Sequence, residues 1–263
     1  MSVLRLRSPL PKIIYPDSDG EPMAENPLQF QWIVTIKEGL DHVFIDRPDV
    51  YVAGDMFWYP VEGQPKICQA PDTMVAFGRP KGYRGSYMQW EEGGIPPQVV
   101  FEVLSPSNRP EPMIQKFNFY EKYGVEEYYV FDPFKVELTG FIRIGGELKA
   151  ISQTNGWTSP RLGIQFRISE GELTIYGPDG QRFLTFQEHA QKSDQFDQVA
   201  QERDQVAQER DQVAQERDQA AQERDQAAQE RDQAAQERDA ERRRAERMAA
   251  QLRALGIEPS TTD

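Results

Sequence analysis

Short runs of β-branched and aromatic residues, separated by Gly, Pro and Asp, recur through the first 190 residues of the chain. Runs of this length, bounded by turn-forming residues, predict β-strands. We expect strands over residues 50–58, 71–77, 98–104 and 128–132, followed by hairpin-like strands in the runs LTGFIRI, GELKAIS, IQFRI and ELTIYG.

Two helices are expected among these strands. Residues 29–40 carry a rough apolar face with helical spacing. Pro106 and Pro110 exclude a helix directly after the third strand, and a helix then runs from about Pro112 to Tyr123. Gly124 stands at the position where a helix commonly ends. The order of the elements predicts a small α/β domain.

The last third of the chain has a strict seven-residue period. DQVAQER occurs three times from Asp197, and DQAAQER follows three times up to Arg238. This period without Gly or Pro predicts one continuous helix over residues 193–255, about 60 residues and roughly 90 Å long.

The repeats suggest a coiled coil, but Val199 and Ala200 are adjacent, so no assignment puts apolar residues at both a and d throughout. A better seam appears at the end, in Ala245, Met248, Leu252 and Leu255. We expect a long exposed helix that joins copies of the chain weakly, zipped at its tip, rather than a stable parallel dimer.

The chain therefore divides into four parts. An extended, proline-rich segment covers residues 1–27, an α/β domain covers 28–190, the long helix covers 193–255 and a disordered tail covers 256–263. About 190 residues are enough for one domain with a sizeable core. No run approaches the roughly 18 apolar residues of a membrane span, and the first residues are too weakly apolar for a secretory signal. We expect a cytoplasmic protein with no membrane contact.

The net charge of −13 is shared by both parts of the chain. Residues 1–192 carry 25 acidic and 19 basic residues, and the remainder carries 18 and 11. Proteins that bind DNA tightly and without sequence preference usually show a positive surface, so this balance disfavours that class. A local basic strip around Arg79, Lys81, Arg84 and Arg109 could still contact DNA, and scattered surface charge is the alternative.

Cysteine and histidine are too scarce for a zinc site. Cys68 is the single cysteine, which also excludes an internal disulfide, and His42 and His189 are the two histidines. Any metal would be held by oxygen, which favours Mg²⁺ or Mn²⁺.

Glu102 closes the apolar run Val99–Phe101 in an expected central strand. A carboxylate in a buried strand must be paired, hydrogen-bonded or bound to a metal, because an uncompensated charge there costs several kcal/mol. Asp72 lies in the preceding expected strand, and Lys116 lies on the following helix, where Tyr120 shares its side at i, i+4. Two acids and a lysine that converge would form a metal-dependent phosphodiesterase site.

Each of these residues also has a structural interpretation. Glu102 could form an ion pair with Lys116, Asp72 could mark a turn after Pro71, and Tyr120 could belong to the core. Asp55, and after it Asp49, are alternative acids for the motif. Ser105 and Ser107 have no histidine nearby, which indicates turn or cap roles instead of a nucleophile.

The segments APDTMVAF, PPQVVFEVLSPSN and QKFNFYEKYGVEEYYVFDP carry a family resemblance. Residues 25–190 resemble the Uma-type family of restriction-endonuclease-like proteins, within the PD-(D/E)XK nuclease superfamily. The resemblance implies a mixed sheet flanked by helices, with Asp72 and Glu102 as metal ligands on adjacent strands. The main-chain carbonyl of Val103 is a further candidate ligand.

This chain departs from the superfamily pattern in two places. Leu104 stands where the usual lysine follows the glutamate by two positions, and the resemblance points to Lys116 as its replacement. Many relatives carry an aspartate four positions before the helical lysine, where this chain has Pro112 beside Glu111.

Three functions remain in competition. The first is an endonuclease that uses Mg²⁺ or Mn²⁺ to hydrolyse DNA, since a metal held by two carboxylates activates water and neutralises developing charge. The second is a catalytically inactive binding module of the same fold, motivated by Leu104 and the acidic surface. The third is a coiled-coil scaffold whose globular head serves as a docking module.

Overall fold

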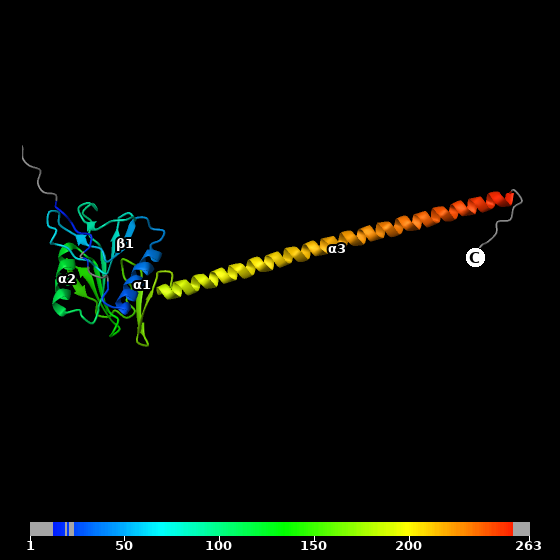
Figure 1. The fold of residues 1–263 in the computed structure, drawn as a ribbon. Coiled ribbons are helices and arrows are strands. Elements are labelled where there is room, and N and C mark those ends of the chain that lie inside the picture. The colour runs from blue at the N-terminus through cyan, green and yellow to red at the C-terminus, as the bar shows by residue number, and fades with distance from the viewer. Residues whose placement is uncertain (1–12, 19, 21–23, 255–263) are drawn as a thin grey trace, which may run out of the picture. The chain divides into compact units, whose positions relative to one another are not determined.

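A six-stranded mixed sheet forms the centre of the first part of the chain (Figure 1). The structure is a computed structural model that describes residues 13–18, 20 and 24–254. Its elements are α1 (Pro27–Val43), β1 (Val50–Gly54), β2 (Trp58–Tyr59), β3 (Thr73–Phe77), β4 (Tyr87–Met88), β5 (Val99–Val103), α2 (Pro110–Tyr123), β6 (Glu127–Asp132), β7 (Glu137–Ile144), β8 (Glu147–Ala150), β9 (Gln165–Ser169), β10 (Glu172–Tyr176) and α3 (Phe186–Ala254).

The strand order of the large sheet is β1-β3-β5-β6-β7-β8. β5 and β6 are parallel, and the other neighbouring pairs are antiparallel. The strands β9 and β10 form a separate hairpin, and β2 pairs with β4. The fold is therefore mixed α/β, as the sequence predicts.

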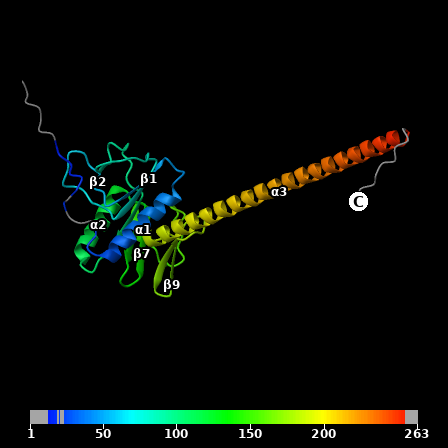
Figure 2. The ribbon, with the colours of Figure 1, turned by 45° about the vertical axis from the view of Figure 1, so that its right-hand side comes forward.

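The two shorter helices cover opposite faces of this sheet, as Figure 2 shows. Ile33 and Leu40 of α1 pack in one apolar cluster with Phe101, whereas Tyr120 of α2 packs in the other with Val100. All five residues of β5 are buried, as expected for a strand in the middle of a sheet covered on both sides. Because successive side chains of a strand point to opposite faces, Val100 and Glu102 both lie on the α2 side.

The expected strand over residues 50–58 is wrong in one respect, because it is two strands. β1 ends at Gly54, and Asp55 has a φ of 47°. Aspartate is one of the few residues that adopt this left-handed conformation readily. The chain turns there, and Trp58 and Tyr59 pair with β4 in a different sheet.

Helix α1 begins earlier than its apolar pattern predicts. The Asn26 side chain accepts a hydrogen bond of 2.9 Å from the Gln29 amide, and Pro27 occupies the first turn. Both are typical of a helix start. Helix α2 also begins at a proline, Pro110, and Gly124 ends it with a φ of 97°, as expected for a glycine at this position.

Helix α3 starts at Phe186, seven residues before the predicted start. Thr185 and Glu188 form a reciprocal cap: the Glu188 amide donates to the Thr185 hydroxyl (3.3 Å), and the Thr185 amide donates to the Glu188 carboxylate (2.8 Å). This capping box satisfies two amides that a helix start leaves unpaired.

The chain forms two compact units, residues 1–191 and 192–263. The tail 256–263 lies outside the described residues, as does most of the proline-rich segment 1–27. Within residues 13–18, 20 and 24–254, no helix is both long and apolar enough to cross a membrane.

Candidate active site

Two carboxylates meet on the α2 side of the sheet. Glu102 lies in β5 and is 3 % exposed. Asp72 directly precedes β3, whose first residue Thr73 pairs with Phe101, so the strand register places Asp72 next to Glu102. The Val103 amide donates a hydrogen bond of 2.6 Å to the Asp72 carboxylate. Met74, two residues after Asp72, packs in the same cluster as Val100, and alternation therefore puts both carboxylates on one face.

Helix α2 supplies two partners for Glu102. The Lys116 ammonium lies 2.6 Å from Oε2, and the Tyr120 hydroxyl donates to Oε1 at 2.6 Å. The spacing i, i+4 predicts that Lys116 and Tyr120 lie on the same side of the helix. In the structure both side chains contact the Glu102 carboxylate. The structural ion pair between Glu102 and Lys116 is thus present, together with the convergence that a metal site requires.

The charges at this site are unbalanced. Burial and the negative charge of Glu102 raise the pKa of Asp72 to about 8, against the opposing effects of Lys116 and the Val103 amide. Burial alone would lower the pKa of Lys116, but Glu102 and Asp72 raise it above its ordinary value. Lys116 is therefore charged at neutral pH, whereas the Asp72 carboxyl holds its proton there.

Two tyrosines border the carboxylates. Burial and Glu102 raise the pKa of Tyr120 far above its ordinary value, so its hydroxyl stays protonated and donates. The ring of Tyr128 lies 5.0 Å from that of Tyr120. The Tyr128 hydroxyl is buried without a hydrogen-bond partner among the described residues.

The Val103 carbonyl is held by a residue that the sequence pattern did not reveal. The Gln29 side-chain amide donates to this carbonyl at 2.9 Å, and the Gln29 side-chain oxygen accepts from the Glu25 amide at 2.9 Å. Asn26 caps α1 and thereby places Gln29 in the first turn of the helix. This Asn-Pro helix start is the sequence signal from which the position of Gln29 could have been predicted. A carbonyl has two lone pairs, so the bond from Gln29 leaves Val103 able to accept a second partner.

These oxygens fit a hard cation. Mg²⁺ is commonly bound by one or two carboxylates and completes its shell with water or substrate oxygens. Asp72, Glu102 and the Val103 carbonyl offer such a set, and the raised pKa of Asp72 shows that positive charge would be favourable there. Among the described residues, no three His, Cys, Asp or Glu side chains are grouped so that they could hold a metal on their own.

The other candidate acids have different surroundings. Asp49 is exposed and paired with Arg47, at 2.9 Å for each of two hydrogen bonds, away from the carboxylate pair. Asp55 lies close by: its amide donates to the Asp72 carbonyl at 3.3 Å, and its charge adds to the raised pKa of Asp72. Asp55 therefore contributes to the electrostatics of the site.

The serines after β5 do not form a nucleophile. The hydroxyls of Ser105 and Ser107 both donate to Glu25, and the Ser105 amide donates to the Asn108 side chain at 2.5 Å. These contacts fix the turn between β5 and α2, as the sequence indicates.

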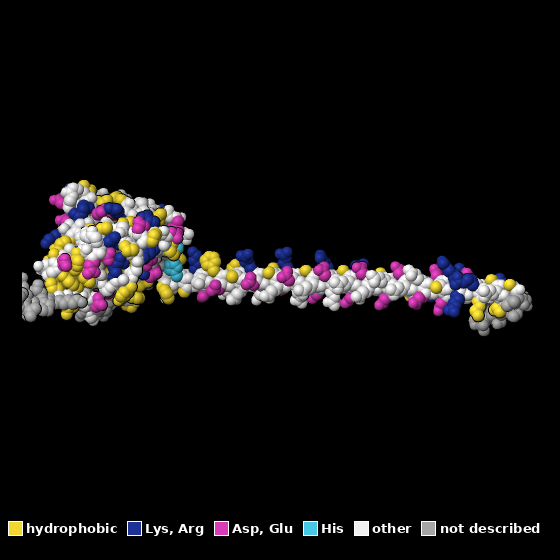
Figure 3. All heavy atoms as spheres, turned by 90° about the horizontal axis from the view of Figure 1, so that it is seen from above, with side chains coloured by type: hydrophobic (Ala, Val, Ile, Leu, Met, Phe, Trp, Pro, Cys, Tyr) yellow, Lys and Arg dark blue, Asp and Glu magenta, His cyan; other side chains and the backbone are white. Residues whose placement is uncertain are grey.

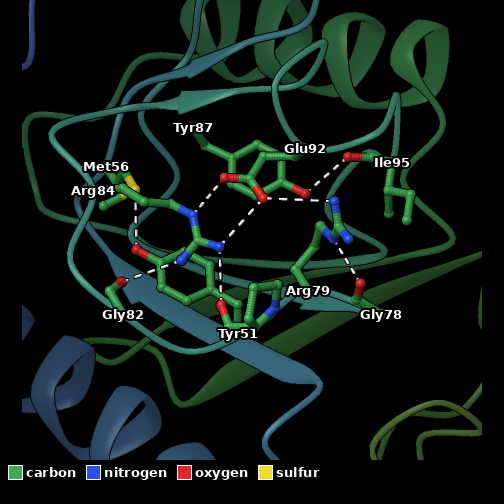
Figure 4. Close-up of polar contacts among 10 residues, drawn as sticks. Tyr51, Met56, Gly78, Arg79, Gly82, Arg84, Tyr87, Glu92 and Ile95 are labelled. Atoms are coloured by element: carbon green, nitrogen blue, oxygen red, sulfur yellow. Dashed lines mark hydrogen bonds and ion pairs between the residues drawn. The ribbon is translucent and has the colours of Figure 1, made fainter.

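The basic strip is neutralised only in part. Figure 4 shows Arg84 and Arg79 directed at the same carboxylate, Glu92, at 2.5 Å and 3.8 Å, with the Arg84 guanidinium 4.0 Å from the ring centre of Tyr51. Lys81 donates to the carbonyls of Phe44 and Ile45. Glu92 carries one negative charge for two arginines, so the strip of Arg79, Lys81, Arg84 and Arg109 keeps a net positive charge.

Comparison with known proteins identifies the family. Residues 4–175 match the Uma2 family, which is described as "Putative restriction endonuclease". A solved structure of "a putative nuclease belonging to DUF820" from Anabaena variabilis is 11% identical, with a TM-score of 0.37, and the alignment covers 51% of this chain and 72% of that one. No curated protein matches. The family match spans more than half of the chain and includes Asp72, Glu102 and Lys116, and the chain belongs to the Uma2 family.

Proposed function

We propose that the protein is a metal-dependent endonuclease that hydrolyses DNA phosphodiester bonds at Asp72, Glu102 and Lys116. The observation that carries this proposal is the pairing of two carboxylates on one face, close enough that Glu102 helps raise the pKa of Asp72 to about 8. Membership of a restriction-endonuclease family supports the same reaction class. The cofactor that fits the oxygen donors is Mg²⁺ or Mn²⁺.

Each residue has a role that its contacts support. Asp72, Glu102 and the Val103 carbonyl would hold the metal, and the Val103 amide fixes the orientation of Asp72 through its 2.6 Å hydrogen bond. Lys116 would supply the positive charge that the missing lysine at position 104 supplies in the superfamily, since its ammonium is held 2.6 Å from Glu102. Tyr120 keeps Glu102 in place from the other oxygen.

When bound, the metal would supply Lewis acidity that activates a water molecule and neutralises charge developing on the phosphate. Fixed positive charge near such a group stabilises the transition state more strongly in a partly buried site than in water. Lys116, whose side chain is 24 % exposed, meets that condition.

The test is cleavage of supercoiled, linear and single-stranded DNA with Mg²⁺ or Mn²⁺, comparing the unaltered protein with Glu102→Gln. The expected result is metal-dependent cleavage that Glu102→Gln reduces by about 100-fold or more, a loss of roughly 3 kcal/mol of transition-state stabilisation.

Glu127→Gln is the matched control, because it removes the charge of another buried strand glutamate. Glu127 is 1 % exposed and accepts hydrogen bonds from the Tyr129 hydroxyl (2.9 Å) and the Arg161 amide (2.7 Å), away from the α2 face. Glu127→Gln should keep the cleavage activity. Equal products from the unaltered protein and Glu102→Gln, or none from either, would contradict the proposal.

One observation favours a second candidate, a catalytically inactive binding module of the same fold. Both oxygens of Glu102 are already engaged, one by Lys116 and one by Tyr120. A carboxylate that is paired with a cation and hydrogen-bonded in this way is stable without a metal. Absence of Mn²⁺ binding to the folded protein, together with absence of cleavage, would favour this candidate.

The long helix is proposed to join copies of the protein, because none of its residues from Phe186 to Ala254 is fully buried in the single chain. A protein acting on DNA in this way would work in the cytoplasm.

A further inference from the structure

The apolar residues at the two ends of α3 share one heptad phase. If Val199 is placed at heptad position d, Phe196 occupies position a. Ala245 and Met248 lie 49 residues, or seven heptads, further along the chain than Phe196 and Val199, so they also occupy positions a and d. Leu252 is the next a position. A phase kept over 49 residues of chain indicates one continuous seam, because an unconstrained helix has no reason to preserve it.

In this register the repeats between the two ends have a regular composition. Position d carries Val199, Val206 and Val213, then alanine three times, and then Glu241 before Met248. In the six repeats, position e carries alanine, position a carries arginine and position g carries glutamate. The arginines at a are Arg203, Arg210, Arg217, Arg224, Arg231 and Arg238, and the glutamate directly before each stands at g.

The surface of α3 is hollowed along part of this seam. A hollow of about 440 Å³ is lined by Val206, Glu209, Arg210, Val213, Ala214 and Arg217. In a parallel coiled coil, a side chain at position a packs into a hole formed by positions d, g, a and d of the partner, which here are residues 206, 209, 210 and 213. A side chain at position d packs into a hole formed by positions a, d, e and a, which here are residues 210, 213, 214 and 217.

The apolar seam is exposed in the single chain. Phe196 is 65 % exposed, Val213 is 63 % exposed and Met248 is 64 % exposed. Figure 3 shows apolar side chains recurring along α3 with arginines beside them. No residue of this 69-residue helix is buried in the single chain, and helices in proteins gain most of their stability from packing one face against a partner.

We propose that the partner is a second copy of this chain, packed against α3 in parallel and in register from Phe196 to Leu252. The charges select this arrangement. In a parallel pair, the arginine at a faces the arginine at a of the partner and also lies next to the partner's glutamate at g, so in each repeat two arginine–glutamate attractions offset one arginine–arginine repulsion. In an antiparallel pair, g faces g, and the glutamates would meet each other. The parallel register also places Phe196 against Phe196 of the second copy, and Leu252 against Leu252.

This arrangement revises the expectation of a helix zipped only at its tip. That expectation depended on the usual coiled-coil pattern of apolar residues at both a and d, which the repeats lack. Arginine at a is compatible with a seam, because its long stem covers the apolar d layer while its charged head reaches the neighbouring glutamate.

Disulfide trapping tests the orientation in the full-length chain, with Cys68 replaced by serine. Val206→Cys and Met248→Cys, each alone, should form a disulfide between copies under mild oxidation. Gln208→Cys, at the outward position f, is the matched control and should cross-link at least about tenfold more slowly. Disulfides that form only when the 206 and 248 variants are combined with cysteines at other positions would show an antiparallel pair and overturn the proposal.

Charge reversal tests the pairing of a with g. Changing Glu202, Glu209 and Glu216 together to lysine should weaken dimerisation by about tenfold or more, measured by analytical ultracentrifugation of the 30.2 kDa chain. Changing Asp204, Asp211 and Asp218 to lysine alters the net charge equally at the exposed position b, and the dimer should survive with an affinity within about threefold.

Circular dichroism of both variants shows whether the helix persists. A chain that is monomeric at all concentrations, or two triple variants with equal effects, would overturn the proposal. Because these readouts need no DNA and no metal, their outcome is independent of the proposed nuclease activity.

Discussion

Lys116 lies 2.6 Å from Glu102, although 14 residues and the start of a helix separate them in the sequence. The Lys116 side chain is 24 % exposed and the Glu102 side chain 3 %. Lys116 therefore acts both as a partner that makes the burial of Glu102 tolerable and as a charge available at the site. Mutations can distinguish the two roles.

Lys116→Met should destabilise the metal-free protein by about 3 kcal/mol, because it leaves a buried carboxylate without its cation. Equilibrium urea unfolding measures this difference. Lys122→Met, on the same helix but exposed, is the control and should change the free energy of unfolding by less than about 0.5 kcal/mol. Equal effects of the two substitutions would show that the ion pair with Glu102 contributes nothing.

Tyr120→Phe and Tyr128→Phe form a matched pair of hydroxyl deletions. The Tyr120 hydroxyl donates to Glu102 at 2.6 Å, and a hydrogen bond to a charged group contributes about 2 kcal/mol. The Tyr128 hydroxyl is buried without a partner among the described residues, so its removal should be neutral or slightly stabilising. Thermal or urea unfolding of both variants checks this order, and a larger loss for Tyr128→Phe would contradict it.

The affinity for Mn²⁺ should rise with pH. Asp72 has a pKa raised to about 8 in the metal-free site, first by burial and next by Glu102. Below that pH the carboxyl is protonated, and a metal must displace the proton, so affinity should fall by roughly tenfold for each pH unit below 8. Calorimetric titration in two buffers of different ionisation enthalpy measures the released proton. An affinity that is flat between pH 6 and pH 8 would rule out this role for Asp72.

The globular unit should keep its activity without most of the long helix. Residues 192–263 form a unit of their own, and all the site residues lie within residues 1–191. A chain ending at residue 192 should therefore cleave DNA at a rate within about threefold of the full chain when both are compared at the same concentration of sites. Loss of all cleavage, with an intact fold by circular dichroism, would favour the scaffold hypothesis.

The fold could be predicted from local patterns where a single signal dominates. Apolar runs placed β3, β5 and β6 within two residues of their observed bounds, and Gly124 marked the end of α2. Asp55 broke the expected strand 50–58 because a left-handed φ has no signature in hydrophobicity. The start of α3 lay in the capping pair of Thr185 and Glu188, outside the heptads on which the prediction depended.

The site was predictable only in part. Glu102 was found because an acid in a buried strand demands a partner, and Tyr120 followed from its spacing to Lys116. Gln29 was missed because its contact with the Val103 carbonyl joins residues 74 positions apart, and only the packing of α1 on the sheet creates it. The pairing of Arg79 and Arg84 with the single carboxylate of Glu92 likewise depends on a loop contact that net charge cannot reveal.

The most direct measurement is an anomalous-scattering map from a crystal of the protein soaked with Mn²⁺. We expect a peak bounded by the Asp72 and Glu102 carboxylates and the Val103 carbonyl, with oxygen distances of about 2.0–2.3 Å, and no such peak in Asp72→Asn. A map with no peak there, while the unaltered protein still cleaves DNA in the same Mn²⁺ concentration, would contradict it.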